Sequence, residues 1–251
     1  MLGSSGARYR SRRGPEGLHL STQCRRLNLF FSRQLPIVGP EGQRRLEEAT
    51  VVVAGVGGLG SVVAEALVRA GIGKLCLVDY DVVSVSDLNR QILYSHEDLG
   101  IKKVDAATKR LLAIRPDVEI VGVQSRITSD FKWPVEPSIV ADCLDNFDSR
   151  FALDEICRRQ EVALVHGGID GLYGQVCTIL PDAVTRLPNL FKGVGQKSTP
   201  AALGAGCMVV GGIQALEVMN FILKGTKGLS TSSTLLAIDL HEFSIERLQL
   251  A

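Results

Sequence analysis

The sequence predicts an α/β protein with a Rossmann-like, doubly wound and mostly parallel sheet, which antiparallel strands continue at its C-terminal end. The first observation is the β-branched apolar run 49–54, which leads into the glycine-rich turn 55–60 and then into the helical stretch 61–70. The second is that further strand-length apolar runs alternate with helical segments as far as residue 168, as in a parallel sheet covered by helices. The third is a C-terminal pair of strand-like runs with the pattern of a hairpin.

Local signals place the elements along the chain. Residues 29–48 have a helical pattern and precede the first strand. Ser86 has the chemistry of a helix N-cap and predicts a short helical turn over 86–94, and Arg115-Pro116 ends a helix over 102–114. The other expected elements are strands at 74–79, 118–123, 138–144, 162–166 and 173–180, a helix at 148–160, a loop-like region at 181–200, an apolar helix at 208–223, and strands at 233–240 and 244–250.

Two regions of the 251-residue chain differ in composition. Residues 1–28 carry six arginines against one glutamate and show no hydrophobic period, so we expect a disordered basic tail. An organelle transit segment, or a start codon assigned too far upstream, would have the same composition. Residues 29–251 are expected to form a single domain, with a nucleotide-binding half over about 29–168 and a second half over about 169–251.

Charge and cysteine usage exclude several classes of protein. The net charge of the whole chain is +1, so the part beyond the basic tail is mildly acidic and gives no electrostatic case for binding nucleic acid. No two of the six cysteines have C-x-x-C spacing, and most lie in apolar stretches, as reduced core cysteines do in cytoplasmic proteins. No uncharged apolar run reaches about 18 residues, so we expect no membrane span.

The strand, glycine turn and helix at 49–70 form the pattern of a phosphate cradle, because glycines allow the backbone to approach an anion and the helix start directs N–H groups toward it. Gly55-x-Gly57-x-x-Gly60 matches the dinucleotide fingerprint, and Asp79 stands where an acid that binds ribose is expected. Taken alone, this fingerprint favours NAD.

Residues further along the chain favour ATP. Arg90 and Lys103 provide cations, and Asp145 follows a strand at the carboxyl edge of the sheet, where open α/β sheets bind ligands. A triphosphate has more charge to offset than a pyrophosphate and usually brings Mg²⁺, which prefers carboxylate oxygens. The sequence has no G-x-x-x-x-G-K-[S/T], which excludes a P-loop kinase or ATPase.

A longer series of motifs occurs in order along the chain: Arg33-Gln34, Gly39-x-Glu41-Gly42-Gln43, the glycine turn, Asp79-x-Asp81, Asn89-Arg90-Gln91, Lys103, Asp145-Asn146 and Gln214-Ala215-Leu216-Glu217. This series resembles the ThiF/MoeB/HesA family, the bacterial relatives of ubiquitin-activating enzymes. The resemblance runs from about Leu29 to the C-terminus. It implies an adenylyltransferase that uses ATP and Mg²⁺ to activate the C-terminal carboxylate of a small ubiquitin-like sulfur-carrier protein ending in Gly-Gly, as in thiamin or molybdopterin biosynthesis.

The resemblance also implies roles for single residues. Gly55, Gly57 and Gly58 would face the nucleotide. Asp79 would bind the ribose, Arg90 and Lys103 would neutralise the phosphates, and Asp145 would hold Mg²⁺. Arg33 would reach into the site of the other subunit of a homodimer. The remaining nucleotide-binding positions that it implies are Asp81, Asn89 and Gln91, and the carrier would bind the half over about 169–251, under a crossover loop.

The chain departs from the family pattern at three places. Asp87 replaces the usual asparagine of Ser-Asn-Leu-x-Arg-Gln, and an ionised aspartate cannot donate a hydrogen bond. The stretch 187–190, where the family has its first zinc C-x-x-C, lacks cysteine, so we expect no structural zinc. The loop 181–200 also lacks the cysteine that some members use for a covalent second step, and Cys207 is the nearest thiol.

Alternative functions stay open at this stage. The same site would also suit adenylation of a peptide or small carboxylate. A catalytically silent homologue that binds a partner is consistent with Asp87 and the missing loop cysteine. An NAD-dependent oxidoreductase rests on the glycine fingerprint alone.

Overall fold

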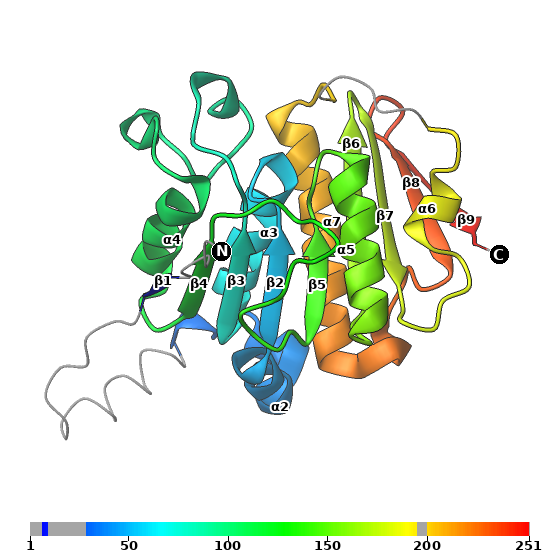
Figure 1. The fold of residues 1–251 in the computed structure, drawn as a ribbon. Coiled ribbons are helices and arrows are strands. Elements are labelled where there is room, and N and C mark those ends of the chain that lie inside the picture. The colour runs from blue at the N-terminus through cyan, green and yellow to red at the C-terminus, as the bar shows by residue number, and fades with distance from the viewer. Residues whose placement is uncertain (1–6, 10–28, 195–199, 251) are drawn as a thin grey trace, which may run out of the picture.

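The computed structural model describes residues 7–9, 29–194 and 200–250. Within them, a nine-stranded sheet runs through the molecule in the order β1-β4-β3-β2-β5-β6-β7-β8-β9 (Figure 1). The strands are β1 (Ala7–Tyr9), β2 (Thr50–Ala54), β3 (Lys74–Val78), β4 (Glu119–Val123), β5 (Ile139–Asp142), β6 (Leu164–Asp170), β7 (Tyr173–Ile179), β8 (Thr234–Asp239) and β9 (Ser244–Gln249). The helices are α2 (Leu35–Glu48), α3 (Gly58–Ala70), η1 (Val85–Asp87), η2 (His96–Asp98), α4 (Lys103–Ile114), α5 (Phe147–Arg159), α6 (Leu187–Leu190), α7 (Gly204–Lys224) and η3 (Gly225–Gly228).

The pairing of the strands confirms the predicted fold class. The five central strands, β4, β3, β2, β5 and β6, are parallel. From β6 onward each strand pairs antiparallel with the next, through β7 and β8 to β9. The boundary expected at residue 168 falls inside the continuous strand β6, so both halves of the domain share one sheet.

Two expectations concern residues near the limits of the described structure. The basic tail was expected to have no regular element, but Ala7–Tyr9 pairs antiparallel with β4 as strand β1. Residues 1–6 and 10–28 lie outside the described residues. The loop expected at 181–200 contains the short helix α6, and its residues 195–199 also lie outside the described part of the chain.

The order of the parallel strands creates a switch point beside β2. From β2 the chain moves outward to β3 and β4, and it then returns to the other side of β2 to form β5 and β6. Register pairs Ala54 at the end of β2 with Asp142 at the end of β5. Open α/β sheets bind ligands in the crevice outside the carboxyl ends of such strands.

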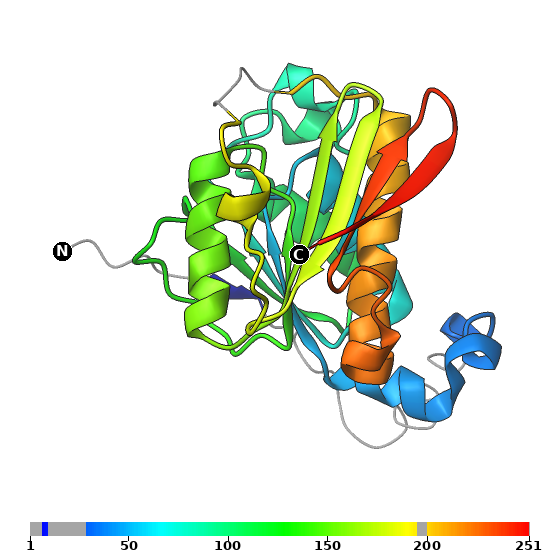
Figure 2. The same ribbon diagram turned by 90° about the vertical axis from the view of Figure 1, so that its right-hand side faces the viewer.

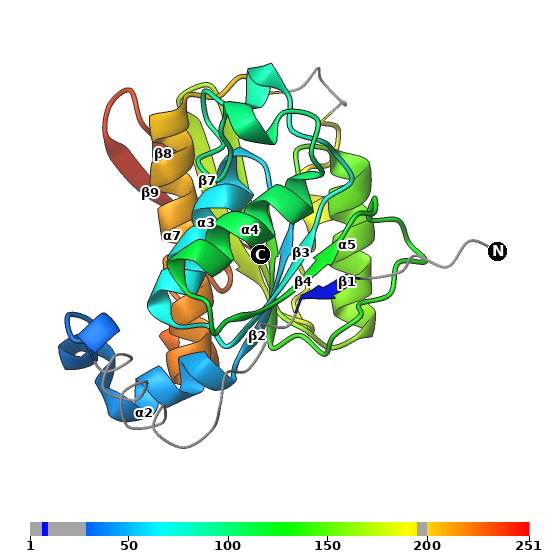
Figure 3. The same cartoon turned by 90° about the vertical axis from the view of Figure 1, so that its left-hand side faces the viewer.

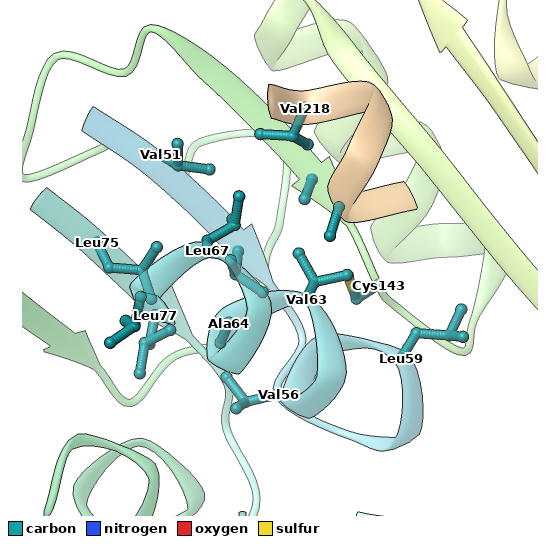
Figure 4. Close-up of a cluster of buried hydrophobic side chains, with 14 of the residues drawn as sticks. Val51, Val56, Leu59, Val63, Ala64, Leu67, Leu75, Leu77, Cys143 and Val218 are labelled. Carbon is teal, nitrogen blue, oxygen red and sulfur yellow. The ribbon is translucent and has the colours of Figure 1, made fainter. Parts of the chain in front are cut away.

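Alternate residues of the parallel strands enter two hydrophobic layers, as strand geometry requires. The layer shared with α3, α4 and α7 includes Val51, Leu75 and Leu77 (Figure 4), and also Val53. The layer shared with α5 and α6 includes the intervening residues Val52, Ala54, Cys76 and Val78. Figures 2 and 3 show α7 and α5 on opposite sides of the sheet. Strands buried on both faces have nearly continuous apolar sequences, which explains why these strands could be predicted.

Helix α7 is a core helix of this domain. Together with η3 it forms the stretch Gly204–Gly228, which is long and apolar enough to span a membrane by length and composition, with a mean hydropathy of 1.6. In the structure, however, Val210 and Val218 are fully buried against the sheet layer. Gln214 donates to the carbonyl oxygens of Asp142 and Val165, so a buried amide ties α7 to β5 and β6.

Helix α2 and the turn before it lie at the end of the sheet opposite to the switch point (Figure 1). The Gln34 side chain donates at 2.7 Å to the carbonyl oxygen of Ala70, the last residue of α3. Arg45 donates to the carbonyl oxygen of Leu223 at 2.7 Å, near the C-terminal end of α7. Since α3 begins at Gly58, this region is separated from the glycine turn by the whole length of α3.

Candidate functional site

A cleft of about 330 Å³ opens at the carboxyl ends of β2, β3 and β5. It lies at the switch point, and Gly55, Asp79 and Cys143, which follow these three strands, line it. Its lining residues are Gly55, Gly57, Gly58, Leu59, Val78, Asp79, Tyr80, Asp81, Ser86, Asp87, Arg90, Gln91, Lys103, Ser125, Ile127, Cys143, Leu144, Asp145, Ser149, Arg150, Ile169, Pro200, Ala202 and Cys207. The structure thus brings together most of the residues that the sequence predicted for the site.

The glycine turn forms one wall of the cleft for steric reasons. Gly55 has φ of 86°, and a Cβ there would lie 2.8 Å from the carbonyl oxygen of Cys143. A Cβ on Gly60 would overlap the carbonyl oxygen of Gly55. The turn can therefore fold tightly against β5 and start α3 at Gly58, with no acidic side chain in the first helical turn. This helix start suits an anion.

Asp79 connects the glycine turn to the end of β3. Its Oδ2 accepts a hydrogen bond from Val56 N at 2.7 Å, and its Oδ1 accepts one from Asp81 N at 2.9 Å. Burial raises the pKa of Asp79, and the two backbone hydrogen bonds act in the opposite direction. A carboxylate has about four acceptor positions, so Asp79 keeps capacity to accept hydrogen bonds from a ligand in the cleft.

Lys103 is a buried residue of the cleft lining. Its Nζ is 3.1 Å from Asp81 Oδ2 and 3.7 Å from Asp87 Oδ2, and its side chain is 6% exposed. Burial acts to lower the pKa of Lys103, but the charges of Asp79, Asp81 and Asp87 outweigh burial and raise it. Lys103 therefore carries a permanent positive charge at the cleft.

Arg90 is held beside Gly58 by its own turn. Its Nη1 donates to the carbonyl oxygen of Ser86 at 2.6 Å and to Asn89 Oδ1 at 3.0 Å. A Cβ on Gly58 would lie 3.7 Å from Arg90 Cγ. Asn89 is not one of the described residues that line the cleft. Its side chain accepts a hydrogen bond from Arg90.

Asp145 stands at the cleft with an exposed carboxylate. Its Oδ1 accepts a hydrogen bond from Asn146 Nδ2 at 3.3 Å, and Asn146 also N-caps α5 by accepting from Ser149 N at 2.9 Å. Mg²⁺ is usually bound through one or two carboxylates, with the remaining ligands coming from phosphates and water, so Asp145 fits this ion. In the described part of the chain, no group of three or more His, Cys, Asp or Glu side chains could hold a metal by itself.

Arg33 lies far from the cleft of its own chain. It is exposed and adjoins Gln34, which contacts the C-terminal end of α3. The cleft is at the N-terminal end of the same helix, and 13 residues of α-helix span about 20 Å. Arg33 therefore does not contribute to this site within one chain.

Sequence reasoning missed a buried network behind the cleft. Asp142, at the end of β5, lies 2.7 Å from His166 Nδ1, and Arg150 Nη1 is 3.2 Å from the same ring. Arg150 also donates to the carbonyl oxygens of Leu144 and Gly167, so it fixes the backbone just before Asp145. His166 ends the predicted strand 162–166, but nothing in the local pattern indicated its pairing with residues 24 and 16 positions away.

Charge and burial set the proton positions in this network. Burial and the Arg150 charge lower the pKa of His166. Burial acts to raise the pKa of Asp142, but Arg150 and the His166 hydrogen bond outweigh it and lower that pKa. Asp142 is therefore a carboxylate that accepts from a neutral His166, and the network positions the Asp145 loop without supplying a proton.

The thiols at the cleft are poor nucleophiles. Burial raises the pKa of Cys207, and it raises the pKa of Cys143 well above its usual value. A reactive cysteine needs thiolate character at neutral pH, which neither environment provides. The cleft thus offers cations, a helix start and a carboxylate, which suits positioning and charge stabilisation of a phosphorylated ligand.

Comparison with known proteins agrees with this chemistry. A model of the ThiF family matches residues 31–251. A SAMP-activating enzyme E1 from Haloferax volcanii is 35% identical over 217 residues, covering 83% of this chain and 79% of that protein. A sulfur carrier protein adenylyltransferase from Thermus thermophilus is 36% identical over 233 residues, covering 85% and 83%. A molybdopterin-synthase adenylyltransferase from Haemophilus influenzae is 31% identical over 231 residues, covering 88% and 94%.

Solved structures of E. coli MccB share the fold. The crystal structure of MccB with ATP has a TM-score of 0.77 at 21% identity, covering 92% of this chain and 78% of that chain. A second MccB structure has a TM-score of 0.79 at 20% identity, covering 92% and 76%. At this identity the likeness establishes the fold.

Proposed function

Because the chain belongs to the ThiF family and its relatives are adenylyltransferases, we propose that it uses ATP to adenylate the C-terminal carboxylate of a small ubiquitin-like sulfur-carrier protein ending in Gly-Gly. The observation that carries this proposal is the convergence of the glycine turn, Asp79, Arg90 and Lys103 on one cleft at the switch point. This combination suits a nucleoside triphosphate, since it offers a phosphate cradle, an acceptor for hydroxyl groups and cations for additional charge.

The proposed reaction needs no covalent intermediate on the protein. A carrier carboxylate oxygen attacks the α-phosphorus of ATP, the bond from that phosphorus to the bridging oxygen breaks, and pyrophosphate leaves with the electron pair. Gly55, Gly57 and Gly58 admit the phosphates to the helix start, and Asp79 accepts from the ribose hydroxyls. Arg90 and Lys103 stabilise the charge that develops on the phosphate oxygens, which is the main means of catalysis in such displacements.

Asp145 completes the proposed site as the protein ligand of the Mg²⁺ that accompanies ATP. When bound, this ion offsets charge on the phosphates and so reduces the repulsion between them and the incoming carboxylate. Arg150 and Asp142 hold the loop of Asp145 in place through the carbonyl oxygen of Leu144 and the backbone N–H of Leu144.

A homodimer explains the position of Arg33. The outer face of α7 exposes Met208, Val209 and Leu216, whose exposed fractions are 50%, 46% and 57%. A two-fold axis that pairs this face with its copy in antiparallel fashion brings the C-terminal end of α7, with α2 and Arg33, toward the partner's α7 N-terminus. Cys207, near that N-terminus, lines the cleft. We therefore place Arg33 at the site of the partner subunit.

The carrier tail reaches the cleft from the second half of the domain. Three residues of this half line the cleft: Ile169 of β6, and Pro200 and Ala202, which precede α7. An extended Gly-Gly tail has no side chains and suits a passage bounded by these small and apolar residues. The buried free thiols Cys76, Cys157 and Cys177 are consistent with the reducing cytoplasm, where we place the enzyme.

Trapping the acyl-adenylate tests this function. The enzyme is incubated with Mg·ATP and each small protein ending in Gly-Gly that the same genome encodes, and hydroxylamine is added to convert an activated carboxylate to a hydroxamate. We expect one such protein to acquire a C-terminal hydroxamate, detected by intact mass. Hydroxamate formation from short peptides or free carboxylates, and from no carrier, would instead favour a peptide-activating enzyme.

A further inference from the structure

Asp87 is fixed as a carboxylate at the base of the cleft. Its Oδ2 accepts from Ser84 N and Ser84 Oγ, both at 2.9 Å, and its Oδ1 accepts from Gln91 Nε2 at 2.6 Å. Its side chain is 9% exposed. All of these neighbours are donors, so they hold the carboxyl group in one orientation.

Both cations of the proposed triphosphate site already have this carboxylate as a neighbour. Arg90 Nη2 lies 3.7 Å from Asp87 Oδ1, and Lys103 Nζ lies 3.7 Å from Asp87 Oδ2. Each cation therefore presents less net positive charge to a phosphate than it would beside a neutral asparagine. The effect is strong because Lys103 and Asp87 are both buried, where charges are weakly screened.

Asp87 also determines which end of the Gln91 amide faces it. An ionised carboxylate only accepts hydrogen bonds, so Gln91 must turn its Nε2 toward Asp87. Gln91 Oε1 is then buried with no hydrogen-bond partner among the described residues. Gln91 lies beside the cradle, since a Cβ on Gly57 would be 3.7 Å from its Nε2. Asp87 therefore takes up a donor of the amide nitrogen that lies beside the phosphate cradle.

The charged side chains of the cleft lining are acidic on balance. They are Asp79, Asp81, Asp87, Asp145, Arg90, Lys103 and Arg150. A bare triphosphate would meet four carboxylates and three cations, whereas a metal-bound triphosphate brings its own positive charge. We propose that Asp87 is a specificity-determining residue that makes nucleotide binding depend on Mg²⁺, so that the cleft binds Mg·ATP and rejects metal-free ATP. This inference rests on the proposed function, since it takes ATP as the ligand.

The Asp87→Asn variant separates the charge from the fold. Asparagine keeps an oxygen for the two Ser84 bonds, removes the negative charge, and donates to Gln91 Oε1 once the Gln91 amide reverses. Asp98→Asn is the matched control, because Asp98 accepts from Ser95 N at 2.8 Å and from Ser95 Oγ at 2.9 Å in the same kind of capping box. Among the described residues, Asp98 is not part of the cleft lining.

Calorimetric titration of the full-length protein with ATP, in Mg²⁺ and in EDTA at constant ionic strength, measures the effect. We expect the wild-type protein to bind ATP at least about tenfold more weakly in EDTA. Asp87→Asn should strengthen metal-free binding about tenfold and change Mg·ATP binding less than about threefold, which reduces the Mg²⁺ dependence. Asp98→Asn should retain the wild-type ratio of the ATP affinities in Mg²⁺ and in EDTA.

Either of two results would overturn the inference: an unchanged ratio of the affinities in Mg²⁺ and in EDTA for Asp87→Asn, or the same change of this ratio in Asp98→Asn. Each of these leaves the proposed function intact, provided that the wild-type protein binds Mg·ATP. Failure of the wild-type protein to bind ATP even with Mg²⁺ would contradict the proposed function itself.

Discussion

At the scale of single residues, the site depends on a few charges held at fixed positions by their neighbours. Arg90 is held by Ser86 and Asn89, and Lys103 by Asp81 and Asp87. The sequence predicted both cations because their spacing matches a known family. It did not predict Arg150, whose role depends on contacts with Leu144, which follows β5, and with His166 and Gly167 of β6.

Arg90→Ala is expected to slow adenylate formation. The variant removes charge stabilisation at the phosphates, so kcat should fall by about 10²- to 10³-fold, as for the loss of one preorganised donor. The thermal midpoint should change little, because the guanidinium group is partly exposed and bonds to its own turn. Arg110→Ala, which removes an exposed arginine of α4 outside the cleft lining, serves as the control. Equal kcat values for the two variants would exclude Arg90 from the reaction.

His166 is expected to make stability depend on pH. Its pKa is lower in the folded protein than the usual 6.5, so below about pH 6.5 the unfolded state binds a proton that the folded state does not. The free energy of unfolding should therefore fall as pH decreases from 6.5 to 5, by up to about 1.4 kcal/mol per pH unit from this residue. Urea titrations at several pH values give the slope of the free energy of unfolding against pH. This slope should be smaller in His166→Gln than in the wild-type protein, whereas the exposed control His241→Gln should keep the wild-type slope. An unchanged slope in His166→Gln would contradict this account.

At the scale of elements, hydrophobic pattern predicted most helices and strands because the core strands are buried on both faces. The expected helix 208–223 is observed as α7, Gly204–Lys224, and the expected strand 118–123 as β4, Glu119–Val123. Strand β1 was missed, since three residues give no period and its pairing with β4 is remote in sequence. The residues of α7 that face solvent could not be told from those that face the sheet, because the helix is apolar on most sides.

Leu216→Glu on α7 is expected to separate the proposed dimer. Leu216 is exposed in one chain, so the change should alter the free energy of unfolding of the monomer by less than about 1 kcal/mol. In the dimer it would place two charges in an apolar contact, and sedimentation should show a monomer with little activity. Val184→Glu introduces a charge at an exposed apolar residue outside α7 and should leave the dimer intact. A dimeric, active Leu216→Glu protein would exclude this face as the interface.

At the scale of the whole molecule, the fold places the cleft and Arg33 at opposite ends of α3. The sequence shows the order of these residues, but it does not show that about 20 Å of helix separates Arg33 from the cleft. Only the structure shows that Arg33 is too far away to reach the cleft of its own chain. In the proposed arrangement, one chain would hold the cradle, the cations and the carboxylate for Mg²⁺, and a second chain would supply Arg33.

Mixed dimers test this arrangement. Arg33→Ala and Arg90→Ala homodimers should each be nearly inactive. When subunits of the two variants exchange, a mixed dimer has one site with both arginines, so random mixing should restore about one quarter of wild-type activity. No recovery after verified subunit exchange would show that Arg33 does not act in the partner's site.

The proposed function is activation of the Gly-Gly tail of a carrier protein with ATP. The most direct measurement is exchange of labelled pyrophosphate into ATP, with the carrier identified by trapping and with the same carrier lacking its last two glycines. We expect rapid exchange with the intact carrier and none with the truncated carrier. Equal exchange with both forms, or no exchange with any carrier ending in Gly-Gly, would contradict it.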